Sequence, residues 1–281
     1  MKVHRAPAAT PSETRLALYD GDVFLLPSTD ASRAMVEAAR AELTRALGTS
    51  DVRSAAHALD EEPFFATIGA VRRAIYLEPR FHELARAMMA GAGLAPDEVA
   101  FDPARLRVIA SRGDENPRAA PVYYPHRDTW YAHPQSVITC WTALDDLAED
   151  ETFVFHPERW RAAVANDSEI FDYDAWVKDG WGLKIGWQDR QSGSTARYPA
   201  VVGALDAGRA VGFSCRAGEV LLFSGAHLHR TLPQATGRTR FSLDLRAVHL
   251  GDHAGGLGAP NVDGRSRGSA LRDYVHPLEH T

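Results

Sequence analysis

Cysteine is scarce in this chain. Cys140 and Cys215 are the only two among 281 residues, too few for the disulfide framework that stabilises small secreted domains. The first residues also lack the apolar run of a secretory signal. Both absences argue against export, and we expect a cytoplasmic protein in a reducing compartment.

Long hydrophobic runs and an excess of positive charge are missing as well. No stretch of about 18 apolar residues occurs, so the sequence predicts no membrane-spanning helix. The chain has 31 Lys and Arg against 37 Asp and Glu, a formal net charge of −6. Because nucleic acids and anionic membranes attract basic surfaces, this balance argues against both as partners. We expect a small-molecule substrate instead.

The composition that remains is that of an ordinary globular protein, with 45% hydrophobic and 24% charged residues. Helix-forming segments precede strand-forming segments, which predicts an α+β fold with an antiparallel sheet. We expect a single domain over residues 1–281 with a loose arm at 1–15. Its expected parts are a mainly helical region at 1–104, a strand-rich core at 105–250 with an insertion at about 157–210, and a tail at 251–281.

Individual elements follow from capping residues and from β-branched or aromatic runs. Helices are expected at Ala31–Leu47 and Phe81–Met89. Strands are expected at Gly21–Pro27, Arg105–Ala110, Val137–Leu144, Thr152–Phe155, Glu219–Phe223 and Arg240–Arg246.

The strongest chemical signal is the segment Pro125-His126-Arg127-Asp128. Residues i and i+2 of a strand point to the same face, so His126 and Asp128 can present an imidazole and a carboxylate from one open face. With a second histidine, these groups would make the two-histidine, one-carboxylate face that binds Fe(II) and leaves other positions open. A His-x-Asp tripeptide alone is frequent by chance, so the second histidine decides the interpretation.

Two histidines could complete such a site. His227 and His229 both follow the apolar run Val220–Phe223 and are two residues apart, so periodicity does not choose between them. Arg238 and Arg240 pose the same choice downstream. An arginine that opens the next strand can form a bidentate pair with a carboxylate of a metal-bound co-substrate.

The order of these motifs resembles the Fe(II)/2-oxoglutarate-dependent oxygenases of the phytanoyl-CoA dioxygenase superfamily. The likeness runs through about residues 20–250 and includes the opening strand and helix at Gly21–Leu47, the His126–Asp128 segment, the strand Cys140–Asp146 and the histidine block. It implies a double-stranded β-helix, or jelly roll, with flanking N-terminal helices. It also implies one oxygenase domain.

The resemblance also implies roles for individual residues. In this family the distal histidine is followed by a polar residue, then a proline, and by an arginine about eleven positions later; His229, Thr231 and Arg240 fit that pattern. The metal ligands would then be His126, Asp128 and His229, with no further catalytic side chain. Arg240 and Thr231 would hold the distal carboxylate of 2-oxoglutarate, and Trp141 would pack beside it.

The implied reaction uses Fe(II), 2-oxoglutarate and O2 to oxidise an aliphatic C–H bond, by hydroxylation or oxidative ring closure. The segment His126–Tyr131 and the long insertion resemble the branch that acts on sugar-containing antibiotics of the orthosomycin and aminoglycoside type. Because Asp128 is a carboxylate, no ligand position is left for chloride, which argues against halogenation. The alternatives are a cupin-type isomerase or ring-cleaving enzyme without 2-oxoglutarate, and a non-catalytic binding module on the same scaffold.

Overall fold

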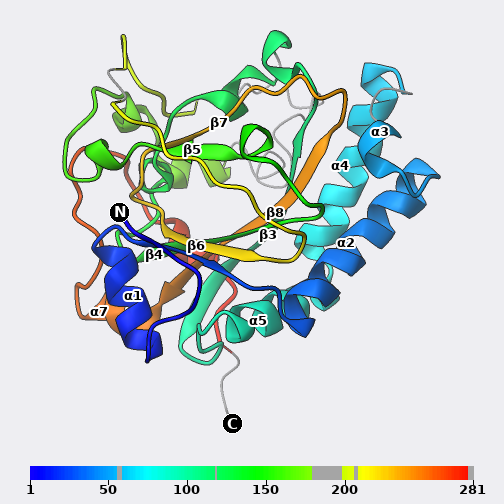
Figure 1. Cartoon of the computed structure of the whole chain (residues 1–281). Coiled ribbons are helices and arrows are strands. Elements are labelled where there is room, and N and C mark those ends of the chain that lie inside the picture. Colours follow the sequence, from blue (N-terminus) through cyan, green and yellow to red (C-terminus); the bar gives the residue numbers. More distant parts are fainter. Residues whose placement is uncertain (56–58, 118, 179–197, 206–207, 278–281) are drawn as a thin grey trace.

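The structure is a computed structural model that describes residues 1–281 except 56–58, 118, 179–197, 206–207 and 278–281. Its strands form two facing sheets (Figure 1). The larger sheet has the order β1 (Val3–His4), β2 (Val23–Leu26), β6 (Val220–Ser224), β4 (Val137–Ala143), β8 (Arg240–His249), β3 (Val99–Ile109), and the smaller one pairs β5 (Phe153–Phe155) with β7 (His229–Thr231). All neighbours are antiparallel except β1 and β2.

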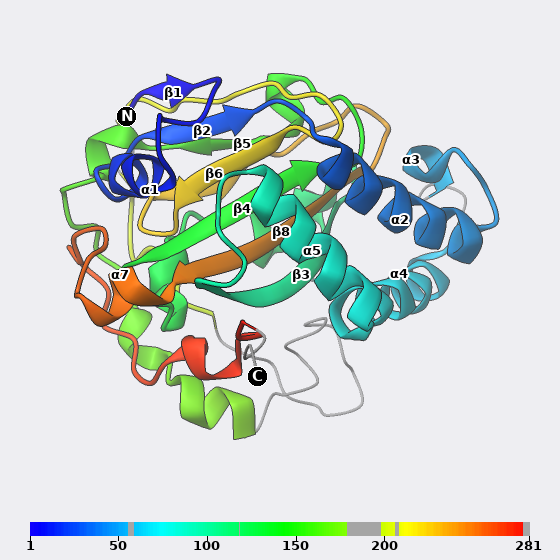
Figure 2. The same ribbon diagram turned by 90° about the horizontal axis from the view of Figure 1, so that it is seen from below.

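Helices cover the outer face of the larger sheet (Figure 2). The α-helices that lie wholly within the described residues are α1 (Pro11–Tyr19), α2 (Asp30–Leu47), α3 (Val52–Ala55), α4 (Glu61–Leu77), α5 (Pro79–Gly91) and α7 (Leu250–Ala254). The long helices α2, α4 and α5 pack against one another and against β3 and β4. Among the described residues, no helix has the length and apolar character needed to cross a bilayer.

Alternation along the central strands separates the core from the cavity. On β8, Phe241, Leu243 and Leu245 point toward the helices and are fully buried in the main apolar core. Burial of each such side chain contributes about 1.5–3 kcal/mol. The intervening residues therefore face the space between the two sheets. They are Arg240, Ser242, Asp244 and Arg246.

The α+β jelly roll with N-terminal helices is confirmed. A second apolar cluster fills one end of the space between the two sheets and includes Trp141, Phe153, Phe155 and Phe223. The expected strands and the two expected helices are present close to their predicted ends, except that β3 begins at Val99 and not at Arg105. The division into parts at residues 104 and 250 stays a prediction, and much of the expected insertion lies outside the described residues.

The expectation of a loose N-terminal arm is wrong. Thr10 caps α1 through a reciprocal pair of hydrogen bonds with Glu13, in which the Thr10 N–H donates to the Glu13 carboxylate at 2.9 Å. Arg15 of this helix then pairs with Asp252 at 2.6 Å. A capping box at residues 10–13 is the local signal for this helix, and the distant carboxylate attaches it to the rest of the fold.

Candidate active site

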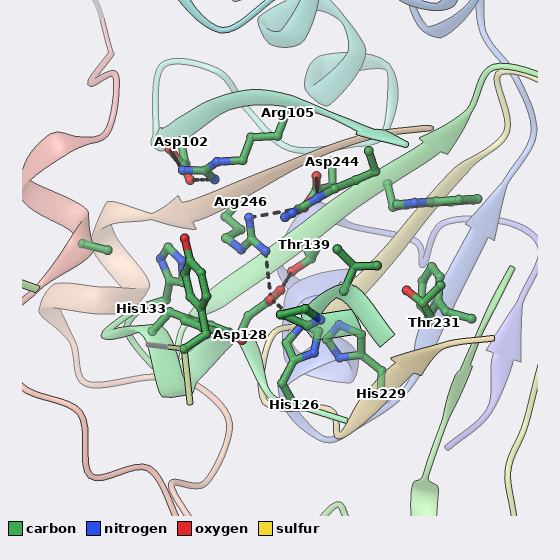
Figure 3. A pocket seen from close by; sticks show the side chains of 18 of the residues that line it. Asp102, Arg105, His126, Asp128, His133, Thr139, His229, Thr231, Asp244 and Arg246 are labelled. Carbon is green, nitrogen blue, oxygen red and sulfur yellow. Dashed lines mark hydrogen bonds and ion pairs between the residues drawn. The ribbon is translucent and has the colours of Figure 1, made fainter. Parts of the chain in front are cut away.

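His126, Asp128 and His229 meet at one point of the cavity, with their potential ligand atoms all within 4.8 Å of one another (Figure 3). Backbone pairing brings the two histidines together: the His126 N–H donates to the His229 carbonyl, and the His229 N–H donates back, each at 3.0 Å. Asp128 opens a short 3₁₀ turn, Asp128–Tyr131. The sequence prediction of a shared strand face is wrong for Asp128, which is buried and not on an open face.

Both imidazoles are oriented by backbone carbonyls. His126 Nδ1 lies 2.9 Å from the carbonyl oxygen of Tyr124, and His229 Nδ1 lies 2.9 Å from that of His227. A ring nitrogen that faces a carbonyl must carry the proton and donate it, so each Nε2 keeps its lone pair for a metal. Burial lowers the pKa of His126 to about 3 and also lowers the pKa of His229, so both rings are neutral at pH 7.

The Asp128 carboxylate accepts two hydrogen bonds. The Thr139 hydroxyl donates to Oδ2 at 2.6 Å, and the Arg246 guanidinium donates to Oδ1 at 2.9 Å. Burial by itself raises the pKa of Asp128, but the charge and the hydrogen bond of Arg246 outweigh it, so the pKa lies well below its usual range. The donor set is therefore two neutral nitrogens and one anionic oxygen, which fits Fe(II).

The two alternative residues that the sequence could not exclude, His227 and Arg238, do not line the cavity. His227 is fully buried and packs against Trp160 in a tilted arrangement, with ring centroids 4.4 Å apart. Arg238 is exposed, and its guanidinium lies 3.7 Å from Asp51. Only one member of each pair, His229 and Arg240, lines the cavity.

The cavity has a volume of about 220 Å³. All six residues predicted to form the site line it: His126, Asp128, Trp141, His229, Thr231 and Arg240. Trp141 packs edge-on against Phe153 and Phe213, with centroids 5.5 and 5.6 Å away. This aromatic packing holds the indole at the wall of the cavity.

Arg240 is buried at the cavity wall without a carboxylate partner in the described part of the chain. Its Nη1 donates to the carbonyl oxygens of Glu151 at 3.2 Å and Thr152 at 2.9 Å. Its Nε has no hydrogen-bond acceptor among the described residues. Burial lowers the pKa of Arg240 to about 10, because desolvation disfavours the charged form. An anionic ligand in the cavity would compensate this charge.

Sequence reasoning missed the charged side chains that support Asp128. Arg246 also pairs with Asp244 at 3.2 Å, and Arg107 donates two hydrogen bonds to Asp244, at 2.7 and 2.9 Å. The signal was present: Arg240, Asp244 and Arg246 alternate with apolar residues along one strand. Polar residues at every second position indicate that the inner face of this strand is a site and not a core.

His133 is a second residue that sequence reasoning did not assign to the site. It lines the cavity, and its Nδ1 lies 2.8 Å from the Tyr274 hydroxyl. Burial lowers the pKa of His133 to about 3, with the charge of Arg246 acting in the same direction. No local pattern announces this pair, because its partners are 141 residues apart.

Comparison with known proteins identifies the family. The sequence profile of the family described as Phytanoyl-CoA dioxygenase (PhyH) matches residues 22–242. The chain belongs to this family. It is therefore an Fe/2-oxoglutarate-dependent oxygenase, and its cofactors are Fe(II), 2-oxoglutarate and O2. No curated protein sequence matches the chain.

Several solved structures are similar to this chain at low identity. EvdO2 from Micromonospora carbonacea var. aurantiaca, complexed with 2-oxoglutarate, is 17% identical with a TM-score of 0.38, over 62% of this chain and 61% of that one. AviO1 from Streptomyces viridochromogenes Tue57 is 14% identical with a TM-score of 0.40, over 86% and 95%. The epimerase SnoN in complex with Fe3+, alpha ketoglutarate and nogalamycin RO is 18% identical with a TM-score of 0.42, over 84% and 82%.

Proposed function

We propose that the chain binds Fe(II) through His126, Asp128 and His229, binds 2-oxoglutarate through Arg240, and oxidises an aliphatic C–H bond of a small molecule. One observation carries this proposal: three metal-donor side chains and a buried guanidinium without a carboxylate partner among the described residues line one cavity. Iron bound there would supply O2 activation coupled to the oxidative decarboxylation of 2-oxoglutarate.

The chain's own residues would bind and orient the reactants. The two carbonyl-bound imidazoles keep Nε2 directed to one point, and the hydroxyl of Thr139 holds the carboxylate of Asp128. Arg240 would form a bidentate pair with the distal carboxylate of 2-oxoglutarate, and the Thr231 hydroxyl would donate a further hydrogen bond. Trp141 and its aromatic neighbours would exclude water from this carboxylate.

For the substrate, we propose a natural product such as a sugar-containing antibiotic or its precursor, oxidised by hydroxylation or ring closure. The support is the sequence resemblance near His126. With Asp128 in the ligand set, no position is free for a halide, so halogenation is excluded from the proposal. A cupin-type reaction without 2-oxoglutarate would leave the buried charge of Arg240 without a ligand, which makes it the weaker alternative.

The direct test is a titration with Fe(II) and 2-oxoglutarate under anaerobic conditions. We expect a visible metal-to-ligand charge-transfer band that saturates with both ligands, and succinate after admission of O2. Asp128→Asn should remove the band, whereas Asp150→Asn, which neutralises an exposed carboxylate, should keep it. Absence of the band from the wild-type protein, or its persistence in Asp128→Asn, would contradict the proposal.

A further inference from the structure

Guanidinium groups outnumber carboxylates on the cavity wall. Among the described residues, five arginines and three aspartates line the cavity. Three arginines have carboxylate partners: Arg105 pairs with Asp102, Arg107 with Asp244, and Arg246 with both Asp128 and Asp244. Fe(II) and the 2-oxoglutarate dianion carry equal and opposite charges, so loading of the proposed site leaves the positive excess in place.

Arg72 accounts for much of this excess. It projects from α4, and its Nε donates to the carbonyl oxygen of Leu106 at 3.2 Å. Neither of its terminal nitrogens has a hydrogen bond or carboxylate partner within the described part of the chain, and the same holds for Nη1 of Arg107. Burial, reinforced by the like charge of Arg107, lowers the pKa of Arg72 to about 10. Arg72 and Arg107 line the same cavity, and the carbonyl that Arg72 contacts belongs to the residue before Arg107. Like charges placed in this way repel each other unless an anion lies between them.

Aromatic side chains connect the metal-donor cluster with this arginine pair. The ring of Tyr131 lies 5.6 Å from that of His126 and 6.0 Å from that of Tyr198. Tyr198 lines the same cavity as Arg105 and Arg107. Burial raises the pKa of Tyr198 to about 12, and the charges of Arg105 and Arg107 act against this rise. Tyrosine rings thus extend along the cavity wall from His126, and such rings suit contact with a flat or cyclic substrate body.

We propose that the substrate carries an anionic oxygen group, a carboxylate or a phosphate, which Arg72 and Arg107 bind while its ring lies along Tyr131 and Tyr198. The inference rests on the proposed function, because it takes the other unmatched arginine, Arg240, as the site of 2-oxoglutarate. It adds a substrate class and a specificity-determining residue, Arg72. A substrate anchored at this end would be oxidised at the opposite end, next to His126.

The test uses the redox-inert Zn(II) form of the full chain and isothermal titration calorimetry. A first titration with 2-oxoglutarate examines the proposed function. The protein saturated with Zn(II) and 2-oxoglutarate is then titrated with benzoate against benzamide, and with phenyl phosphate against phenol. We expect one or both anions to bind at least about 10-fold more tightly than the matched neutral compound, the scale of one hydrogen-bonded charge pair. The better anion identifies the preferred group.

Variants of α4 separate specific binding from general charge. Arg72→Gln keeps a long polar side chain and should weaken the preferred anion at least about 10-fold without changing the affinity for its neutral counterpart. Arg72→Lys should fall between the two. Arg73→Gln is the matched control, because Arg73 is the exposed neighbour on the same helix and its loss changes the net charge equally. Thermal unfolding of each variant checks that the fold is intact.

The outcomes distinguish this inference from the proposed function. If 2-oxoglutarate binds but neither anion does, or if the amide and phenol bind as well as the acids, the anion site is refuted and the proposed function stands. An unchanged anion affinity in Arg72→Gln refutes it as well. If 2-oxoglutarate does not bind, the proposed function fails; the anions are then titrated into metal-free Arg72→Gln and Arg240→Gln, and loss only in the latter overturns the role of Arg72.

Discussion

Replacement of Arg246 by glutamine tests whether this side chain supports the metal-binding carboxylate. Arg246 donates to Asp128 at 2.9 Å and forms an ion pair with Asp244 at 3.2 Å, and all three side chains are almost fully buried. Glutamine keeps polar atoms at this position but removes the charge. Asp128 then depends on the Thr139 hydroxyl alone, while Asp244 keeps its two hydrogen bonds from Arg107.

The magnitude follows from this inventory. Removal of one partner from a buried ion pair costs about 3–5 kcal/mol, because the remaining charge stays buried without compensation. Since Asp244 retains Arg107, we expect the lower end of this range, about 3 kcal/mol, as the loss in free energy of unfolding of the metal-free protein at pH 7.5. Arg216→Gln, which removes an exposed arginine, is the control and should change this free energy by less than about 0.5 kcal/mol.

The pH dependence gives the prediction its sign. In the wild type the pKa of Asp128 lies well below its usual range, so its contribution to stability is present above about pH 4 and is lost as the pH falls through the low folded-state value. Without Arg246, burial dominates and raises this pKa, so the variant favours the protonated carboxyl. The stability deficit should therefore be largest near neutral pH and shrink as the pH falls toward 5.

Urea unfolding at pH 7.5 and pH 5, with and without Zn(II), measures these effects. A bound divalent cation takes over part of the charge compensation, so Zn(II) should stabilise the variant more than the wild type. A deficit below about 1 kcal/mol at pH 7.5, far under the cost of breaking a buried ion pair, would refute the reasoning. So would a deficit that neither acid nor Zn(II) reduces.

Three further predictions concern neighbouring groups. His229→Ala should abolish 2-oxoglutarate consumption, whereas His227→Ala should lower thermal stability and keep turnover; the reverse pattern in a succinate assay would move the site to the other histidine. Arg240→Ala should raise the 2-oxoglutarate dissociation constant, measured by calorimetry, by about 10²-fold, and Arg238→Ala should leave it unchanged. The free energy of unfolding should fall as the pH decreases from 6.5 to 4, because burial lowers the pKa of His126 to about 3 and the unfolded chain therefore binds the proton first. Each such histidine changes this free energy by at most about 1.4 kcal/mol per pH unit. Urea unfolding at several pH values measures the change, and a flat profile would contradict the prediction.

The sequence predicted the scaffold because its central strands follow local rules. In the sequence, Phe241, Leu243 and Leu245 alternate with polar residues. In the structure, the apolar residues form the core-facing side of β8 and the polar residues form its cavity-facing side. The choice between His227 and His229 was beyond the same rule, since β7 begins only at His229 and the preceding residues form a turn. The alternation of side chains between the two faces holds only within a strand. His229 is the first residue of β7, so alternation does not extend back from it to His227.

Strand alternation also does not apply to Asp128, because this residue lies in a 3₁₀ turn and not in a strand. The prediction placed it with His126 on a strand face, and the two do converge, but they do so through a backbone bridge to His229 and a 3₁₀ turn. The sequence therefore predicted that His126 and Asp128 converge, but it did not predict that Asp128 is buried. The buried Asp128 carboxylate accepts hydrogen bonds from Thr139 on β4 and Arg246 on β8, and the sequence around Asp128 gives no information about these distant partners.

The position of Arg105 and Arg107 on the cavity wall depends on one irregularity of β3. Asp102 pairs with Arg246 and Arg105 pairs with Asp244, so three residues on β3 match two on β8 and the strand contains a bulge. Strict alternation from Asp102 would instead have turned both arginines toward the helices, where an unpaired charge is costly. Pro103 lies inside this bulge, and proline, which has no N–H to donate, is confined to sheet edges and bulges. Pro103 is compatible with this bulge and with the position of β3 at the edge of the sheet, and the register shift directs the arginines of β3 into the same cavity as the metal-donor cluster.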